Sequence, residues 1–159
     1  SVFDDMVFRS VPFYKQTQGL IISFLTKRLD KGARVVDLGC STATTLLELY
    51  KLRSDLELLG IDNSLAMLER AKNRATGYGA KIELINADIL EYDYNRADAV
   101  MLNYTLQFIR PIKRDEFVKK IFEKTLLKKL TSSCSCVTMR SNQTQRKRTD
   151  PIYEKTKSF

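Results

Sequence analysis

Short apolar runs alternate with segments of helical periodicity through the first 130 residues, and this alternation limits the fold more than any other feature. The β-rich runs cover residues 34–37, 56–61, 81–86 and 97–103. Apolar residues recur at helical spacing in residues 15–29, in the segment from Leu46 to Leu52, in 65–75 and in 111–126. Strands that alternate with helices predict one open, mainly parallel α/β sheet.

The absence of histidine excludes several kinds of site. A Ser-His-Asp or Cys-His nucleophile system and a histidine-ligated metal site all need a residue that this chain lacks, and we expect no metal. The three cysteines, Cys40, Cys134 and Cys136, are too few for a disulfide framework and favour a cytoplasmic, reducing setting. No apolar run approaches the roughly 20 residues of a membrane span, so we expect no membrane partner and no signal peptide. A motif begins almost at Ser1, which suggests a fragment at that end.

The composition changes near residue 130. Residues 131–159 are rich in Ser, Thr, Lys, Arg and Gln and carry half of the formal net charge of +8. We therefore divide the chain into an α/β domain, 1–130, and a basic, disordered or loosely packed tail, 131–159. A solvated tail is favoured over an RNA-binding arm. Residues 133–139 could form a weak fifth strand, so the fold is expected to be truncated after strand four or five, with that strand at an exposed edge.

Polar residues follow the predicted strands at the edge where open α/β sheets bind ligands. After the first strand comes Asp37-Leu38-Gly39-Cys40-Ser41, a glycine turn that can direct backbone N–H groups and a helix N-terminus at a ligand. After the second comes Asp62-Asn63, about 20 residues beyond the turn, where a carboxylate can accept both ribose hydroxyls. Asn63-Ser64 can also cap the helix that follows. A nucleoside ligand is favoured over a purely structural turn.

The residues after strands three and four narrow the ligand further. Asp88-Ile89 offers a carboxylate and a backbone N–H suited to adenine, although a solvated acid at a strand end is the plain alternative. Ser41 and Thr44 stand where the dinucleotide fingerprint needs its second and third glycines, which disfavours NAD. After strand four, Asn103-Tyr104 opens a segment that lacks the N-P-P-[YF] signature of amino-group methyltransferases.

Five motifs in order over residues 1–128 resemble the carboxy-S-adenosylmethionine synthases, also called tRNA (cmo5U34) methyltransferases. They are Val2-Phe3-Asp4-Asp5-Met6-Val7, Arg9-Ser10-Val11-Pro12-Phe13-Tyr14, Asp37-Leu38-Gly39-Cys40-Ser41, Ile61-Asp62-Asn63-Ser64 with Met67, and Asn103-Tyr104-Thr105-Leu106-Gln107-Phe108. The resemblance implies the Rossmann-like α/β fold of class I S-adenosylmethionine-dependent methyltransferases.

The resemblance also implies a reaction: S-adenosylmethionine and prephenate give carboxy-S-adenosylmethionine, phenylpyruvate and water. A downstream carboxymethyltransferase would then use the product on tRNA wobble uridine, so tRNA is only an indirect partner, and the family suggests a homodimer. The cofactor contacts carried over from the family are Tyr14, Gly39, Cys40, Ser41, Asp62, Asn63, Asp88, Ile89 and Asn103. No residue is assigned to catalysis, because cofactor and substrate supply the reactive groups. Cys40 is interpreted as a small turn residue rather than a nucleophile, and Arg9 as a salt-bridge or carboxylate-binding residue.

The chain departs from the family in two places. Ala43 stands where the family usually has glycine, and the family's C-terminal strands and carboxylate-binding arginine have no match after residue 130, so Arg146 and Arg148 are not given that role. Two other functions stay open: an ordinary S-adenosylmethionine-dependent methyltransferase, and a remnant that binds the cofactor without turnover. The tail is either native or the product of a reading-frame change, which the coding DNA around the Leu130 codon distinguishes.

Overall fold

The computed structural model describes residues 6, 11, 13–95 and 97–125, and the backbone of two further strands, Leu127–Ser132 and Ser135–Arg140. In chain order the elements are α2 (Tyr14–Arg28), β1 (Arg34–Leu38), α3 (Thr44–Leu52), β2 (Glu57–Asp62), α4 (Leu65–Gly77), β3 (Ile82–Asn86), β4 (Ala99–Asn103), a 3₁₀ turn η1 (Leu106–Phe108), α5 (Pro111–Thr125), β5 (Leu127–Ser132) and β6 (Ser135–Arg140).

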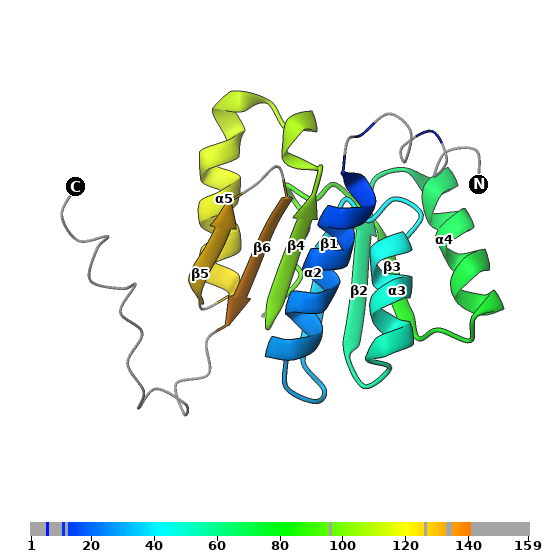
Figure 1. The fold of residues 1–159 in the computed structure, drawn as a ribbon. Helices are drawn as coiled ribbons and strands as arrows, with labels where there is room; N and C mark the ends of the chain where they lie inside the picture. The colour runs from blue at the N-terminus through cyan, green and yellow to red at the C-terminus, as the bar shows by residue number, and fades with distance from the viewer. Residues whose placement is uncertain are drawn as a thin grey trace, which may run out of the picture.

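The strands form one sheet in the order β3-β2-β1-β4-β6-β5, which Figure 1 shows with the helices packed on its two faces. β3, β2, β1 and β4 run parallel, and β6 is antiparallel to both β4 and β5. The predicted α/β class is therefore confirmed. The strand order reverses between β1 and β4, and ligands of open α/β sheets bind at such a switch point, outside the carboxyl ends of the strands.

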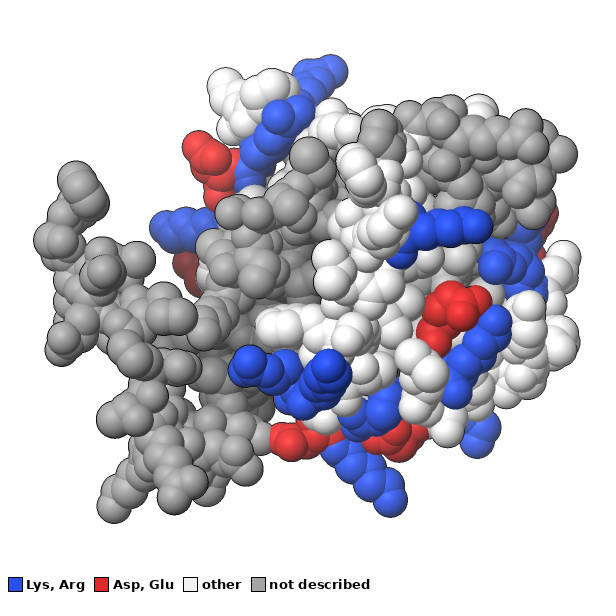
Figure 2. Space-filling model, viewed as in Figure 1, with Lys and Arg blue, Asp and Glu red and all other residues white. Residues whose placement is uncertain are grey.

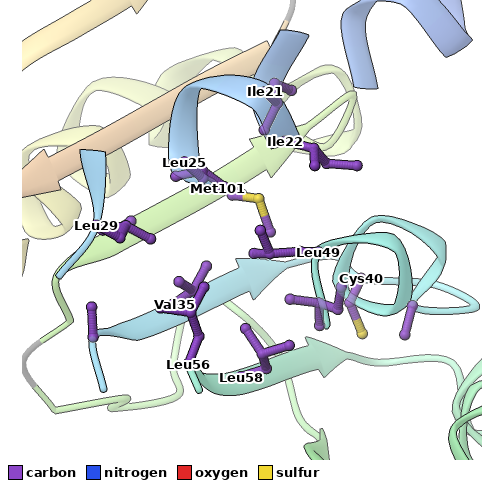
Figure 3. Close-up of a cluster of buried hydrophobic side chains, with 14 of the residues drawn as sticks. Ile21, Ile22, Leu25, Leu29, Val35, Cys40, Leu49, Leu56, Leu58 and Met101 are labelled. Atoms are coloured by element: carbon purple, nitrogen blue, oxygen red, sulfur yellow. The ribbon is translucent and has the colours of Figure 1, made fainter. Parts of the chain in front are cut away.

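Two apolar clusters hold the helices to the sheet. Alternate residues of a strand point to opposite faces, so Val35 belongs to the cluster beneath α2, α3 and α4, and its neighbour Val36 to the cluster beneath α5. Figure 3 shows side chains of α2, among them Leu25, gathered near Met101 of β4. The cluster beneath α5 reaches the carboxyl ends of β1 and β2 through Leu38 and Ile61, and the other cluster reaches the turn after β1 through Cys40. The floor of the candidate site is therefore packed.

The helices and strands expected from periodicity agree with the structure to within one or two residues up to α5. Apolar spacing overstated burial at three positions, because Leu20 is 72% exposed, Leu52 is 65% exposed and Leu65 is 60% exposed. The side chains of these three residues face solvent rather than the sheet.

The end of the sheet differs from the expectation. The weak strand expected over 133–139 corresponds to β6, but β5 was not expected. α5 ends at Thr125, and residue 126, to which this helix was expected to continue, lies outside the described residues. β4 is not at an edge, because β1 pairs with one side of it and β6 with the other. β5 spans the boundary expected at residue 130. Residues 141–159 lie outside the described part of the chain, so the nature of the basic tail stays a prediction.

Charged side chains are distributed widely over the described surface. On the face drawn in Figure 2, Lys and Arg side chains lie in several separate groups among acidic and uncharged residues, without merging into one basic surface. In the described part of the chain, no helix combines the length and apolar character that crossing a membrane requires.

Candidate functional site

A cavity of about 700 Å³ lies along the carboxyl ends of β1 to β4. This volume is within the range of about 300–1,000 Å³ that is usual for small-molecule sites. Its wall includes all nine residues predicted to contact a cofactor: Tyr14, Gly39, Cys40, Ser41, Asp62, Asn63, Asp88, Ile89 and Asn103. Residues separated by up to 89 positions in the chain are thus brought to one site, although their contacts with a cofactor remain a prediction.

The turn after β1 depends on Gly39. This residue has φ of +80°, and a Cβ there would lie 2.6 Å from Oγ1 and 2.7 Å from Cγ2 of Thr105. Thr105 is fixed in turn, because its hydroxyl donates to the carbonyl oxygen of Leu38 at 2.8 Å. The turn after β1 and the segment after β4 therefore pack in direct contact, with no room for a side chain at position 39.

The backbone N–H groups of the turn are used inside the protein. Those of Gly39 and Cys40 donate to the carbonyl oxygen of Ile61 at 2.8 and 3.1 Å, and that of Ser41 donates to Oδ2 of Asp62 at 2.8 Å. The expectation that these N–H groups point at a ligand is therefore wrong for this structure. The turn reaches over to β2, because the end of that strand offers acceptors that no neighbouring strand has satisfied.

Asp62 ties two loops together through its carboxylate. Oδ2 accepts the N–H of Ser41, and Oδ1 accepts the N–H of Ser64 at 2.8 Å. Ser64 is the residue before α4, as expected, but its side chain makes no capping hydrogen bond. Asp62 instead holds the backbone of Ser64, by accepting its N–H from two residues upstream. Each carboxylate oxygen has a second lone pair, so both can still accept a hydrogen bond from a ligand.

Asp37 is a site residue that the sequence argument did not single out. It lies at the end of β1, lines the cavity and is only 3% exposed. Burial, and to a lesser extent the negative charge of Asp62, raises the pKa of Asp37 from 3.8 to about 7. The sequence did contain a signal for Asp37, because an acid stands at the end of an apolar strand, just before the glycine turn. Acids with a shifted pKa in a cleft are typical of functional sites.

Cys40 and Ala43 occupy buried positions in the same turn. Burial, together with the charges of Asp37 and Asp62, raises the pKa of the Cys40 thiol, which keeps it protonated and unreactive at neutral pH. This supports the interpretation of Cys40 as a small turn residue. Ala43 is fully buried with φ of +54°, the left-handed conformation that suits the glycine more usual in the family. Its methyl group fits in the core.

The hydroxyl of Ser41 has no partner among the described residues, although it is buried. Ser41 also has a positive φ of 51°. Buried polar atoms are nearly always satisfied by protein, water or a ligand. An unsatisfied hydroxyl on the cavity wall thus provides a hydrogen-bonding position for a bound molecule.

Arg74 connects the end of α4 to the start of α3. Its Nη1 donates to Oγ1 of Thr44 at 2.8 Å, to Oγ1 of Thr42 at 3.2 Å and to the carbonyl oxygen of Thr42 at 3.3 Å. Both threonines line the cavity. Local sequence patterns did not predict this contact, because Arg74 is 32 residues from Thr42 and 30 residues from Thr44 along the chain.

Aromatic rings meet at the cavity wall between α2 and the segment after β4. The rings of Tyr14 and Tyr104 stack with centroids 5.4 Å apart and an interplanar angle of 23°, and both residues line the cavity. The predicted contact residue Tyr14 is thus placed by an aromatic partner from the Asn103-Tyr104 segment. Arg9, Arg146 and Arg148 lie outside the described residues, and within the described ones no group of three potential ligands could hold a metal ion.

A family model described as a methyltransferase domain matches residues 35–128. The chain belongs to the methyltransferase domain family. The matched range of this methyltransferase domain begins in β1 and includes the turn, Asp62, Asp88 and the whole of α5.

Curated relatives of the methyltransferase domain confirm the resemblance seen in its motifs. It is 62% identical over 122 residues to the carboxy-S-adenosyl-L-methionine synthase of Campylobacter fetus subsp. fetus, covering 77% of this chain and 52% of the relative. It is 53% identical over 123 residues to the synthase of the same name from Nautilia profundicola, covering 77% of this chain and 53% of that relative. The chain spans about half the length of the curated relatives it matches.

Solved structures confirm the Rossmann-like methyltransferase fold. The plantazolicin methyltransferase BpumL in complex with SAH aligns with a TM-score of 0.62 at 16% identity, over 77% of this chain and 47% of that one. An S-adenosylmethionine-dependent methyltransferase from Clostridium acetobutylicum aligns with a TM-score of 0.57 at 22% identity, over 76% of this chain and 49% of that one. At these identities the likeness concerns the fold alone.

Proposed function

We propose that the methyltransferase domain binds S-adenosylmethionine in the 700 Å³ cavity and takes part in carboxy-S-adenosylmethionine synthesis. The observation that carries the proposal is the convergence of the nine predicted contacts on one cavity wall, in a chain whose relatives at 46–62% identity are named carboxy-S-adenosyl-L-methionine synthases. Binding of the cofactor is the first part of the proposal, and the reaction is the second.

The ribose and adenine of the cofactor fit the groups after β2 and β3. Asp62 keeps acceptor capacity on both oxygens for the ribose hydroxyls, while its bonds to Ser41 and Ser64 hold it in position. Asp88 accepts the N–H of Leu90 through Oδ1 at 2.8 Å, which leaves Oδ2 for the adenine amino group. The neighbouring N–H of Ile89 suits a ring nitrogen.

The methionine part of the cofactor fits the groups at the end of β1. The orphan hydroxyl of Ser41 gains a partner when a polar group of the ligand is bound. Asp37 is a buried acid whose ionised form is favoured by a neighbouring positive charge. A cationic ligand such as S-adenosylmethionine supplies that charge, whereas a neutral nucleoside does not.

The proposed reaction converts S-adenosylmethionine and prephenate into carboxy-S-adenosylmethionine, phenylpyruvate and water. A separate carboxymethyltransferase would then use the product to modify tRNA wobble uridine. S-adenosylmethionine supplies the activated methyl group bonded to its sulfonium centre. The residues of this chain bind and orient it: Asp62 holds the ribose, Asp37 faces the positive charge, and the rings of Tyr14 and Tyr104 shield one side of the cavity from water. A cytoplasmic location and a homodimer belong to the same proposal.

Mass spectrometry of the cofactor after incubation with the purified chain tests the proposal. A prephenate-dependent gain in mass of one carboxyl group supports the synthase reaction. Conversion of S-adenosylmethionine to S-adenosylhomocysteine that needs an added methyl acceptor and does not need prephenate identifies an ordinary methyltransferase instead. Calorimetry provides the separate test of binding: measurable affinity for S-adenosylmethionine without turnover limits the chain to cofactor binding, and absence of any affinity contradicts the whole proposal.

A further inference from the structure

Two basic residues line the cavity on the side away from the predicted nucleoside contacts. Arg110 comes directly before α5 and Lys113 lies in its first turn. We propose that Arg110 and Lys113 form a subsite for the carboxylate of an organic acid that binds beside the cofactor. This inference rests on the proposed function and extends it to the second substrate.

The charges of the cavity are separated along its length. Asp37 and Asp62 lie at the carboxyl ends of β1 and β2, and Asp88 follows β3, whereas Arg110 and Lys113 follow β4. Within the described part of the chain, no salt bridge reaches either cation. The exposed acids at the start of α5, Asp115 and Glu116, are not part of the cavity wall. Two cations on a cavity wall that have no counter-ion among the described residues attract an anionic ligand.

The segment that carries the two cations is held in place by its neighbour Arg114. The guanidinium of Arg114 donates to the carbonyl oxygens of Ile109 at 2.8 Å and Gln107 at 3.3 Å. The N–H of Lys113 donates to the carbonyl oxygen of Arg110 at 2.9 Å, which joins the two proposed residues through one turn. These hydrogen bonds fix the backbone of the segment, so only the exposed side chains of Arg110 and Lys113 have to be ordered on binding.

The strand order places Arg110 and Lys113 beyond the predicted adenine and ribose contacts, on the same side of the cavity as the predicted cofactor contact Asn103. Predicted adenine, ribose and turn contacts follow β3, β2 and β1, which are consecutive in the sheet. The next strand is β4, and the segment after it carries Arg110 and Lys113. Phe108 lines the same end and is 83% exposed. A bare ring beside two cations favours a carboxylate on an apolar carbon frame over an inorganic anion.

Calorimetry with prephenate as the organic-acid probe tests the subsite. S-adenosylhomocysteine is titrated into the full chain, and prephenate is then titrated into the saturated protein. The variant Arg110→Glu/Lys113→Glu should bind prephenate at least about tenfold more weakly, while its affinity for S-adenosylhomocysteine changes less than about threefold. The matched control is Lys72→Glu/Lys119→Glu, which makes the same change in net charge at two exposed residues outside the cavity wall. It should behave like the wild type.

The same variants identify the source of the carboxylate. If Arg110→Glu/Lys113→Glu loses affinity for prephenate alone, the subsite binds the co-substrate. If the variant loses affinity for carboxy-S-adenosylmethionine but not for S-adenosylmethionine, the same subsite binds the carboxylate of the carboxylated cofactor. Three results overturn the inference. In Arg110→Glu/Lys113→Glu, the affinity for both carboxylated ligands is unchanged, or the affinity for S-adenosylhomocysteine falls by the same factor. In the wild type, inorganic phosphate binds as tightly as prephenate.

Failure of the cofactor proposal gives a different result. If the wild type does not bind S-adenosylhomocysteine, prephenate is titrated into the protein alone. Binding that disappears in Arg110→Glu/Lys113→Glu and persists in Lys72→Glu/Lys119→Glu still supports the subsite. Absence of prephenate binding, or binding that ignores the two substitutions, overturns it.

Discussion

The side chain of Thr105 fills the space beside Gly39, with its Oγ1 2.6 Å from the position that a Cβ at residue 39 would take. This contact joins the carboxyl ends of β1 and β4, the two strands between which the sheet order reverses. The cavity floor therefore depends on a glycine for steric reasons as well as for its left-handed backbone.

Gly39→Ala is expected to destabilise the chain by about 2–4 kcal/mol, because it combines a left-handed alanine with an overpacked contact. Thr105→Ala removes both of the atoms closest to the new Cβ. The double variant should therefore be more stable than the sum of the single effects predicts, by about 1–2 kcal/mol. Urea denaturation of the four proteins measures this coupling, and strict additivity would show that the steric contact is unimportant.

Asp62→Ala is expected to weaken S-adenosylmethionine binding by roughly 1.5–3 kcal/mol, on the scale of hydrogen bonds to a charged group. It should also lower the free energy of unfolding, because the N–H groups of Ser41 and Ser64 lose their acceptor. Calorimetry well below the unfolding temperature separates the two effects. Asp98→Ala is the matched control: Asp98 accepts the N–H of Arg34 at 2.9 Å at the other end of β1, so stability should fall while affinity is kept. Unchanged affinity in a folded Asp62→Ala protein would remove Asp62 from the ribose site.

The pH dependence of stability is expected to depend on Asp37. Its pKa is raised from 3.8 to about 7 in the folded chain, so between these values the native state holds more protons than the unfolded state. The free energy of unfolding should therefore fall as pH rises through this window, by up to about 1.4 kcal/mol per pH unit. The chain has no histidine to mask the effect.

Asp37→Asn removes this titration while keeping the size of the side chain. Urea denaturation of both proteins at several pH values between about 4 and 8 should show the decline in the wild type and a flatter profile in the variant. Parallel profiles would show that Asp37 is already ionised in this range.

Arg74→Ala is expected to lower the free energy of unfolding by about 1–2 kcal/mol, because Thr42 and Thr44 lose a charged hydrogen-bond donor. Arg74→Lys should recover only part of the loss, since an ammonium group does not reproduce the guanidinium geometry. Arg70→Ala, one turn earlier on α4 and exposed, is the control and should change little. Equal effects of Arg70→Ala and Arg74→Ala would indicate a general charge effect on the helix.

Local sequence patterns predicted the elements and the position of the site, because hydrophobic periodicity and strand-end polar residues are local signals. They did not predict what the polar groups bond to. The N–H groups of Gly39 and Cys40 are taken by Ile61, and Arg74 reaches Thr42 across the fold. Such contacts depend on which strands and helices become neighbours. For the same reason β5, whose sequence LKKLTS lacks strand-like alternation, is visible only through its pairing with β6.

Asp37 also affects the heat of ligand binding. The chain has no histidine, and burial raises the pKa of Asp37 to about 7, so this acid is close to half-protonation at neutral pH. A cationic ligand that settles beside it favours the ionised form, so a proton leaves for the solvent. The buffer takes up that proton, and the measured enthalpy of binding then contains the buffer's own heat of ionisation. Cofactor titrations of this chain in Tris and in phosphate should consequently give different enthalpies, and their difference counts the protons released.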